Sequence, residues 1–164
     1  MLQASTASDL RVQKRRVEAT LTLTTGLTVR GYFFLWDARL AGEGSERPDE
    51  LLNSAHGFFP FERLDGRSPR VVLYNVALVS VVTLAEHAGR AVPGYEVAAV
   101  RHVSLLMSSG QTLSGTIRIH RPAGCDRVSD WLREPEAFRY LETDRTTLLV
   151  NIHHVAEVVE RESR

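Results

Sequence analysis

The sequence is poor in cysteine and lysine, because Cys125 and Lys14 are the only residues of their kinds. A single cysteine excludes an internal disulfide and a zinc site made of several cysteines, and it is typical of proteins from a reducing compartment. No apolar run approaches the roughly 18 residues of a membrane-spanning helix, and residues 1–10 lack the charged and then apolar pattern of a secretory signal. We therefore expect a cytoplasmic protein that does not bind a membrane.

The sequence also lacks net charge, since 20 basic residues balance 20 acidic residues. A protein without net positive charge has no general electrostatic attraction for nucleic acid, although a local basic patch can still bind it. The densest basic run lies just before the first apolar pattern and contains Lys14, Arg15 and Arg16. We interpret this run as a solvated approach to the first strand, and nucleic-acid contacts by these three residues are the alternative.

Recognisable catalytic motifs are missing as well. No glycine-rich phosphate loop precedes a helix, and Ser108-Ser109-Gly110 has the composition of a hairpin turn rather than of a nucleophile elbow. Cys125 follows a glycine in a loop, and nothing in the sequence indicates the low thiol pKa that a catalytic cysteine needs. We therefore predict a non-enzymatic protein with no catalytic residue, no cofactor and no metal ion.

Four histidines offer the alternative to that prediction. His102 and His120 are expected on the outward face of one hairpin, and His153 and His154 follow Asn151. Adjacent histidines on a strand point to opposite faces, so at most one of the pair 153 and 154 can join a given site. A metal-dependent enzyme built on these histidines is the third function that the sequence leaves open.

Two segments with the alternation of β-hairpins, residues 17–37 and 103–121, dominate the sequence. In each, apolar residues alternate with polar ones, which is typical of half-buried strands. One glycine in each segment predicts a turn, and a second glycine five positions later predicts a bend or a close approach of another backbone. The turn glycines are Gly26 and Gly110, and the bend glycines are Gly31 and Gly115.

The register of these hairpins follows from their apolar faces. A pairing that keeps the apolar residues of both strands on one face places Gly31 opposite Leu21 and Gly115 opposite Leu105. A glycine at such a position lets a small sheet curl into a barrel.

Three further features recur in the same order after each hairpin. A short helical turn is expected at residues 49–53 and again within residues 127–133, an aromatic pair follows, and an asparagine precedes the last apolar strand. Because the order is the same, we infer a duplication. Asparagine tolerates left-handed backbone, so each asparagine predicts a tight corner. The aromatic pairs are Phe59 and Phe61, matched by Phe138 and Tyr140, and the corner residues are Asn75 and Asn151.

Parts of both copies resemble a known family, the Sm-like proteins. One spacing is similar to the first half of the Sm motif, another is similar to the second motif of bacterial Hfq-type proteins, and a third segment resembles an uncharacterised group of bacterial small-barrel domains. These are Gly26-x4-Gly31-x5-Asp37, Tyr74-x-x-Ala77-Leu78-x-x-Val81-Val82, and residues 127–141.

The resemblance implies a small, strongly bent five-stranded barrel in each copy, and RNA as a ligand class. Hfq-type RNA binders carry Lys-His at the corner between the last two strands, where this chain has Asn75-Val76 and Asn151-Ile152. Arg121 stands where the Sm pattern has aspartate. The resemblance therefore supports the fold more strongly than RNA binding.

We expect a mainly β protein of two tandem SH3/Sm-like small barrels, each with a short inserted helix. The predicted boundaries are a disordered or basic lead-in at 1–16, a first barrel at 17–84, a linker at 85–98, a second barrel at 99–159 and a charged tail at 160–164.

The outward face of the first hairpin carries a row of aromatic residues that needs a partner surface. It comprises Tyr32, Phe34 and Trp36, with Arg30 beside them. We predict that this face binds a protein partner or a second copy in a non-enzymatic binding or assembly module. The alternative is a nucleic-acid binding protein that stacks bases on the same aromatics.

Overall fold

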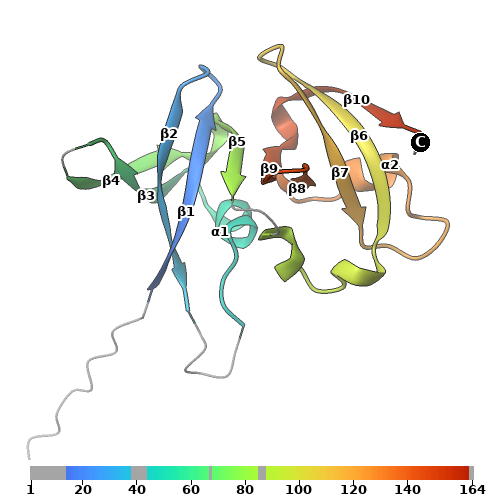
Figure 1. Ribbon diagram of the computed structural model, residues 1–164, viewed down its shortest axis with the longest axis horizontal. Helices are drawn as coiled ribbons and strands as arrows, with labels where there is room; N and C mark the ends of the chain where they lie inside the picture. Colours follow the sequence, from blue (N-terminus) through green and yellow to red (C-terminus); the bar gives the residue numbers. More distant parts are fainter. Residues whose placement is uncertain (1–13, 38–43, 67, 85–87, 163–164) are drawn as a thin grey trace, which may run out of the picture.

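The computed structural model describes residues 14–37, 44–66, 68–84 and 88–162. In this part of the chain, ten antiparallel strands form one open sheet, and two short α-helices and four 3-10 turns connect them (Figure 1). No helix among the described residues is long and apolar enough to cross a membrane. The elements are β1 (Lys14–Leu23), β2 (Thr28–Trp36), α1 (Pro48–Ser54), β3 (Phe58–Leu64), β4 (Pro69–Asn75), η1 (Val76–Leu78), β5 (Val79–Leu84), η2 (Ala88–Ala91), η3 (Tyr95–Val97), β6 (Ala99–Met107), β7 (Thr112–Ile119), α2 (Val128–Leu132), β8 (Phe138–Glu142), β9 (Thr147–Asn151), η4 (Ile152–His154) and β10 (Val155–Arg161).

The strand order shows two halves with the same internal arrangement. The full order is β10-β6-β7-β8-β9-β5-β1-β2-β3-β4, so the first half reads β5-β1-β2-β3-β4 and the second reads β10-β6-β7-β8-β9. The pairing of β9 with β5 joins the halves into one sheet. Strands β4 and β10 form its two edges.

The hairpin registers differ from the expected ones by two residues. Gly31 lies opposite Ala19 rather than Leu21, and Gly115 lies opposite Val103 rather than Leu105. The turn explains the shift. Gly26 has a left-handed φ of 85° and is the last residue of a short loop, not its centre. Each residue of β2 therefore pairs with a β1 residue two positions earlier than expected.

The close approach of another backbone, which the second glycine of each hairpin predicted, is confirmed. A Cβ atom on Gly31 would lie 2.0 Å from the carbonyl oxygen of Glu62, and one on Gly115 would lie 2.4 Å from that of Glu142. The neighbouring strand, β3 or β8, therefore crosses directly over the glycine. Only a residue without a side chain permits this approach.

The two asparagine corners are confirmed, but not through left-handed backbone. Asn75 and Asn151 are both extended, with φ of −71° and −77°. Each side chain accepts a hydrogen bond from the backbone N–H two residues later and so caps a 3-10 turn. Asparagine is used here as a cap.

Both predicted helical turns are present and begin in the same way. The N–H of Arg47 donates to Glu50 Oε2 at 2.8 Å, and the N–H of Arg127 donates to Asp130 Oδ2 at 3.2 Å. In each helix, the acidic side chain in the third position thereby accepts a hydrogen bond from the backbone N–H of the residue before the helix.

The ends of the predicted barrels also need correction. Strand β1 starts at Lys14, so Lys14, Arg15 and Arg16 belong to a strand rather than to the lead-in, whose other residues lie outside the described part. Strand β10 continues to Arg161, into the predicted tail. The division into two domains with a linker at 85–98 stays a prediction.

The aromatic pairs match one residue away from the predicted alignment. Phe58 faces Asn75 and Phe138 faces Asn151, so Phe58, not Phe59, is the counterpart of Phe138. The position equivalent to the buried Phe59 holds Arg139. The Phe-x-Phe and Phe-x-Tyr patterns misled the alignment, because ten positions separate the start of the helix from the start of the next strand in both halves, Pro48 to Phe58 and Val128 to Phe138.

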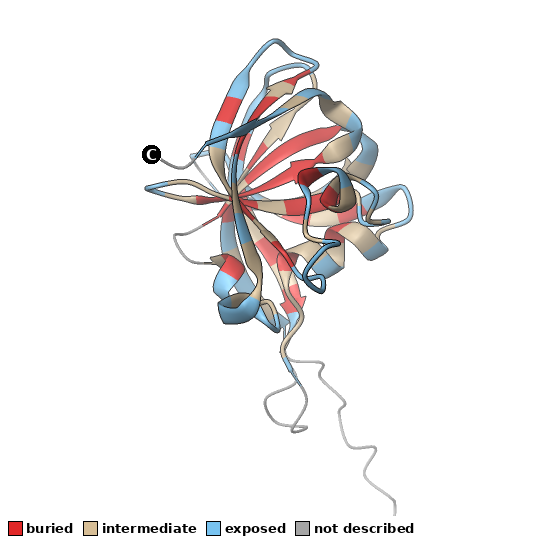
Figure 2. Cartoon of the chain, turned by 90° about the vertical axis from the view of Figure 1, so that its right-hand side faces the viewer, coloured by how far each residue is buried: buried red, intermediate tan, exposed pale blue. Residues whose placement is uncertain are grey.

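Buried side chains form two apolar clusters, one in each half. The buried residues lie mostly on the strands inside the molecule (Figure 2). The cluster of the first half centres on Phe33, Phe59 and Phe61, and the second on Ile117 and Trp131. The first cluster also contains Phe138 and Leu149 from the second half. The halves therefore share apolar packing as well as backbone pairing.

Replacing Gly31 by valine should lower the free energy of unfolding by about 3 kcal/mol, because the branched side chain cannot share space with the Glu62 carbonyl. Urea unfolding monitored by circular dichroism would measure it. The control is Thr28→Val, which adds valine at an exposed position of the same strand. Equal midpoints for the two variants would contradict the close approach of β2 and β3.

Candidate functional site

The aromatic row on β2 is only partly open. Trp36 is 42% exposed, whereas Tyr32 and Phe34 are half-buried. The guanidinium of Arg16 lies 4.3 Å from the centre of the Tyr32 ring and covers its face. The binding surface expected at these residues stays a prediction.

Carboxylates already pair with two of the basic residues beside this row. Arg30 bonds Glu18, with Nε donating at 2.7 Å, and that hydrogen bond and charge raise the pKa of Arg30. Arg16 forms an ion pair with Glu62. Phosphate contacts here would have to replace existing partners. Arg15 donates to the backbone carbonyl of Glu46, and Lys14 is exposed at the start of β1, so nucleic acid stays an untested alternative partner.

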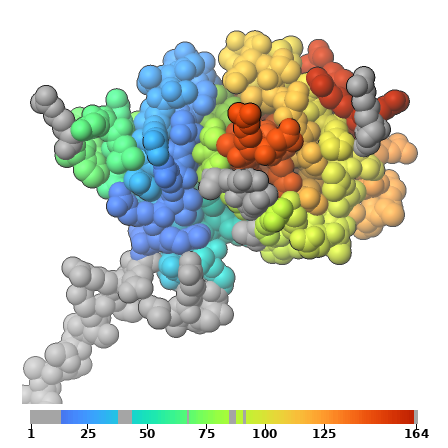
Figure 3. Space-filling view, viewed as in Figure 1, coloured from blue at the N-terminus to red at the C-terminus, as the bar shows by residue number. Residues whose placement is uncertain are grey.

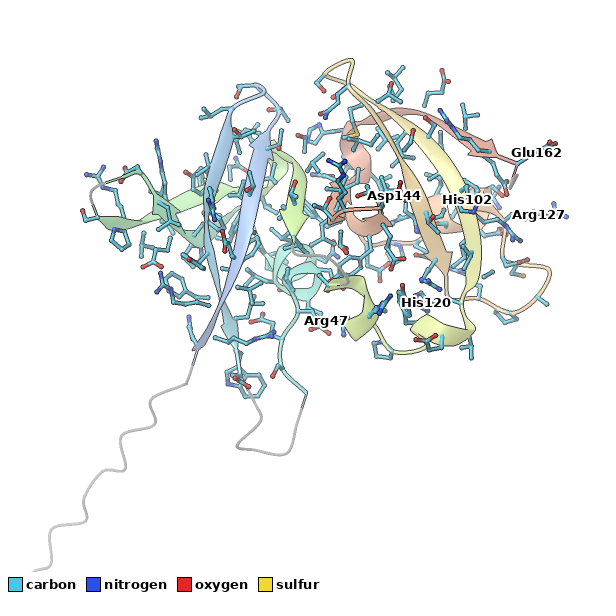
Figure 4. The ribbon with its side chains drawn as sticks, viewed as in Figure 1. Arg47, His102, His120, Arg127, Asp144 and Glu162 are labelled. Atoms are coloured by element: carbon cyan, nitrogen blue, oxygen red, sulfur yellow. The ribbon has the colours of Figure 1, made fainter. Side chains whose placement is uncertain are left out.

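The histidines of the second half do not gather. His102 bonds Thr116 at 3.2 Å on the β6–β7 ribbon, and His120 lies beyond the end of β7 (Figure 4). His154 donates through Nε2 to the Ala77 carbonyl at 2.8 Å. Within residues 14–37, 44–66, 68–84 and 88–162, no three histidine, cysteine, aspartate or glutamate side chains are grouped to hold a metal ion.

The joint between the halves combines backbone pairing with side-chain hydrogen bonds. Strands β5 and β9 pair in the register Val81–Val150 to Leu84–Thr147. Asn53 at the end of α1 bonds both backbone groups of Phe138, the first residue of β8. Its Nδ2 donates to the Phe138 carbonyl at 3.0 Å, and its Oδ1 accepts from the Phe138 N–H at 2.8 Å.

Polar side chains fix the same joint on both sides. Asn151 is buried and donates to the Val79 carbonyl at 3.0 Å. The Tyr140 hydroxyl donates to Asp49 Oδ1 at 2.7 Å, and burial, together with the Asp49 carboxylate, raises the pKa of Tyr140. The phenol thus stays protonated and keeps donating.

Apolar burial completes the joint. Phe138 is 3% exposed and Leu149 is fully buried, and both pack against the first half. They meet a surface that includes Val79 and Val82, which are also fully buried.

The counterparts of these residues are uncovered at the two edges of the sheet. Phe58, the counterpart of Phe138, is 61% exposed, and Leu73, the counterpart of Leu149, is 65% exposed. On β10, the counterparts of Val79 and Val82 are Val155 and Val158, which are only half-buried. The molecule therefore presents both surfaces of its own internal joint a second time, each without a partner in the described chain.

The two edges extend in opposite directions. Strand β4 reaches one side of the molecule and β10 reaches the other, as Figure 1 and the space-filling view of Figure 3 show, while the end of β4 and the start of β10 lie near the middle. The two strands do not pair with each other in the described chain.

The sequence analysis missed these edges. Phe58, Val71 and Leu73 were not among the predicted site residues, because an apolar residue on a strand is ordinarily buried. A signal was present in the adjacent Phe58 and Phe59, since neighbours on a strand point to opposite faces. Comparisons with models of protein families, with curated proteins and with solved structures found no match.

Replacing Asn53 by alanine should lower the free energy of unfolding by about 2 kcal/mol, because it leaves both backbone groups of the buried Phe138 without partners. Differential scanning calorimetry would measure the loss. The matched control is Ser54→Ala, which removes one exposed hydrogen bond within α1. A change no larger than that of the control would contradict the role of Asn53 in the joint.

Proposed function

We propose that this protein is a non-enzymatic assembly module of two tandem Sm-like barrels that associates with further copies of itself, head to tail. In this association, β4 of one copy pairs with β10 of the next. The observation that carries the proposal is the β5–β9 joint, because β9 and β5 are the counterparts of β4 and β10. The chain thus contains one example of the contact that it would make with its neighbours.

The internal joint gives the register of the external one. Moving each pair of the β5–β9 ladder to its counterparts places Glu157 opposite Tyr74, Val158 opposite Leu73, and Glu160 opposite Val71. An antiparallel pair in this register satisfies the free backbone groups of both edges.

The apolar surfaces match in the same way. Phe58 and Leu73 of one copy would cover Val155 and Val158 of the next, as Phe138 and Leu149 cover Val79 and Val82 inside the chain. Fully burying an exposed leucine or phenylalanine contributes about 1.5–3 kcal/mol. This gain favours a second copy over solvent at these edges.

The asymmetry of the contact limits the form of the assembly. The contact joins two different surfaces, so it is heterologous, and repeated addition gives either a closed ring or an open filament. Because β4 and β10 extend in opposite directions, each copy can bind two neighbours (Figure 3).

Two carboxylates make the external contact weaker than the internal one. Glu157 and Glu160 of β10 stand where β5 has the buried Val81 and Leu84. Charged residues on an edge strand oppose uncontrolled pairing. We therefore expect a reversible assembly that grows with protein concentration.

The first test is Leu73→Arg. The added charge would be buried in the contact, so the variant should associate at least about tenfold more weakly than the parent in light scattering across a concentration series. The control is Val97→Arg, which places the same residue at an 88% exposed valine of η3, away from both edges. A parent that stays monomeric at every concentration would overturn the proposal, as would equal masses for the two variants.

The second test strengthens the contact. The double variant Glu157→Val, Glu160→Leu restores apolar residues of the kind that β5 uses, and should tighten association at least about tenfold, because two buried carboxylates are removed. Sedimentation velocity at fixed concentration would show the shift to larger species. An unchanged distribution would mean that β10 is not the contact strand.

The third test reads the register. In a Cys125→Ser background, Leu73→Cys with Val158→Cys puts two thiols directly opposite, at about 4.5–5.5 Å between Cα atoms, and oxidation should give a ladder of linked chains on a non-reducing gel. The control pair, Val71→Cys with Val158→Cys, is diagonal, at about 7–8 Å, and should link poorly. A stronger ladder from the control would contradict the register.

A further inference from the structure

A cavity of about 570 Å³ lies beside the second half, between the segment that links β5 to β6 and the strands β7 and β8. Its walls come from the turns η2 and η3, from the end of β7, from α2 and from β8, and Asp49 of α1 reaches it from the first half. His120, labelled in Figure 4, stands on its wall. Cavities of this size hold small molecules rather than folded partners.

Four aromatic side chains line the wall, and its charged side chains include two ion pairs. Arg118 pairs with Glu142 at 3.4 Å and covers the ring of Tyr95 at 3.6 Å. Arg121 pairs with Glu134 at 3.6 Å. The aromatic lining residues are Tyr95, Trp131, Phe138 and Tyr140.

Arg139 is the unusual residue of this wall. It is 6% exposed and stands at the position that Phe59 occupies in the core of the first half. Its Nε donates to the Glu136 carbonyl at 2.8 Å and its Nη2 to the Glu134 carbonyl. Its Nη1 is buried without any hydrogen-bond partner.

The electrostatics of Arg139 favour an added anion. Burial lowers the pKa of this guanidinium, and the Trp131 ring lies 5.1 Å from it. A buried charge with an unsatisfied donor is costly, and an anionic acceptor removes both penalties with a charge-assisted hydrogen bond. The first half tolerates phenylalanine at this position, so the fold itself does not need a cation there.

We propose that this cavity binds a small organic anion, with a carboxylate or phosphate group beside the Arg139 guanidinium and an apolar or aromatic body against Trp131, Phe138 and Tyr140. The shared chemistry is one anionic head on one flat body. The site is separate from the edges β4 and β10, so the test of ligand binding does not depend on self-association.

The test uses 8-anilinonaphthalene-1-sulfonate, an anion with aromatic rings whose fluorescence rises in apolar surroundings. We expect saturable binding to the full chain at one site. Arg139→Met should weaken it at least about tenfold, because the charge-assisted bond is lost. Arg139→Lys should retain most of the affinity, and the matched control Arg133→Met, at a side chain that is 80% exposed, should retain all of it.

A second variant leaves Arg139 in place. Val92 lines the cavity from the linking segment, and Val92→Trp should fill it and abolish probe binding while circular dichroism stays unchanged. This keeps the proposal testable if Arg139→Met fails to fold.

Competition then separates the two head groups. Displacement of the probe by benzoate alone indicates a carboxylate ligand, and displacement by phenyl phosphate alone indicates a phosphate ester. Three results would overturn the proposal: no saturable binding, binding that survives both Arg139→Met and Val92→Trp, or binding removed by Leu73→Arg, which would place the probe on the β4 edge.

Discussion

The backbone pairing of β5 with β9 is the interaction on which the rest of this structure depends. It turns two five-stranded arrangements into one ten-stranded sheet, and it brings Phe138 and Leu149 into the core of the first half. Each half has two edge strands, and the joint pairs one from each half, β5 and β9. The other two, β4 and β10, therefore remain as edges of the whole sheet. The number and position of the exposed edges therefore follow directly from this one pairing.

The exposed edges carry apolar residues similar to those that form the internal joint. Inside the chain, Val79, Val82, Phe138 and Leu149 exclude water from the joint. An edge with similar residues and no partner exposes both apolar area and unpaired backbone groups, which folded proteins ordinarily protect against. Glu157 and Glu160 supply such protection on β10, and Pro69 and Arg70 supply it at the start of β4. Val71 and Leu73 of β4 nevertheless stay exposed, and this observation led us to propose an association of copies.

The two halves also differ at a position away from the exposed edges. Arg139 replaces the buried Phe59, and Trp131 lies beside it in the core of the second half. The substitution exchanges apolar packing for a buried cation next to a cavity, and a buried cation is unfavourable without a partner. The second half thus carries features suited to a ligand, whereas the first half keeps an aromatic core of Phe33, Phe59 and Phe61.

The sequence by itself determined the elements that depend on neighbouring residues. The alternating strands, the turn at Gly26, the helix after Arg47 and the capped corner at Asn75 are all local, and each was predictable from residue spacing. The tertiary structure alone decided the hairpin registers, the β5–β9 joint, the exposure of Phe58 and the cavity at Arg139. These features depend on which distant strands lie side by side, and no local pattern encodes that choice, since a buried and an exposed strand edge can carry the same residues.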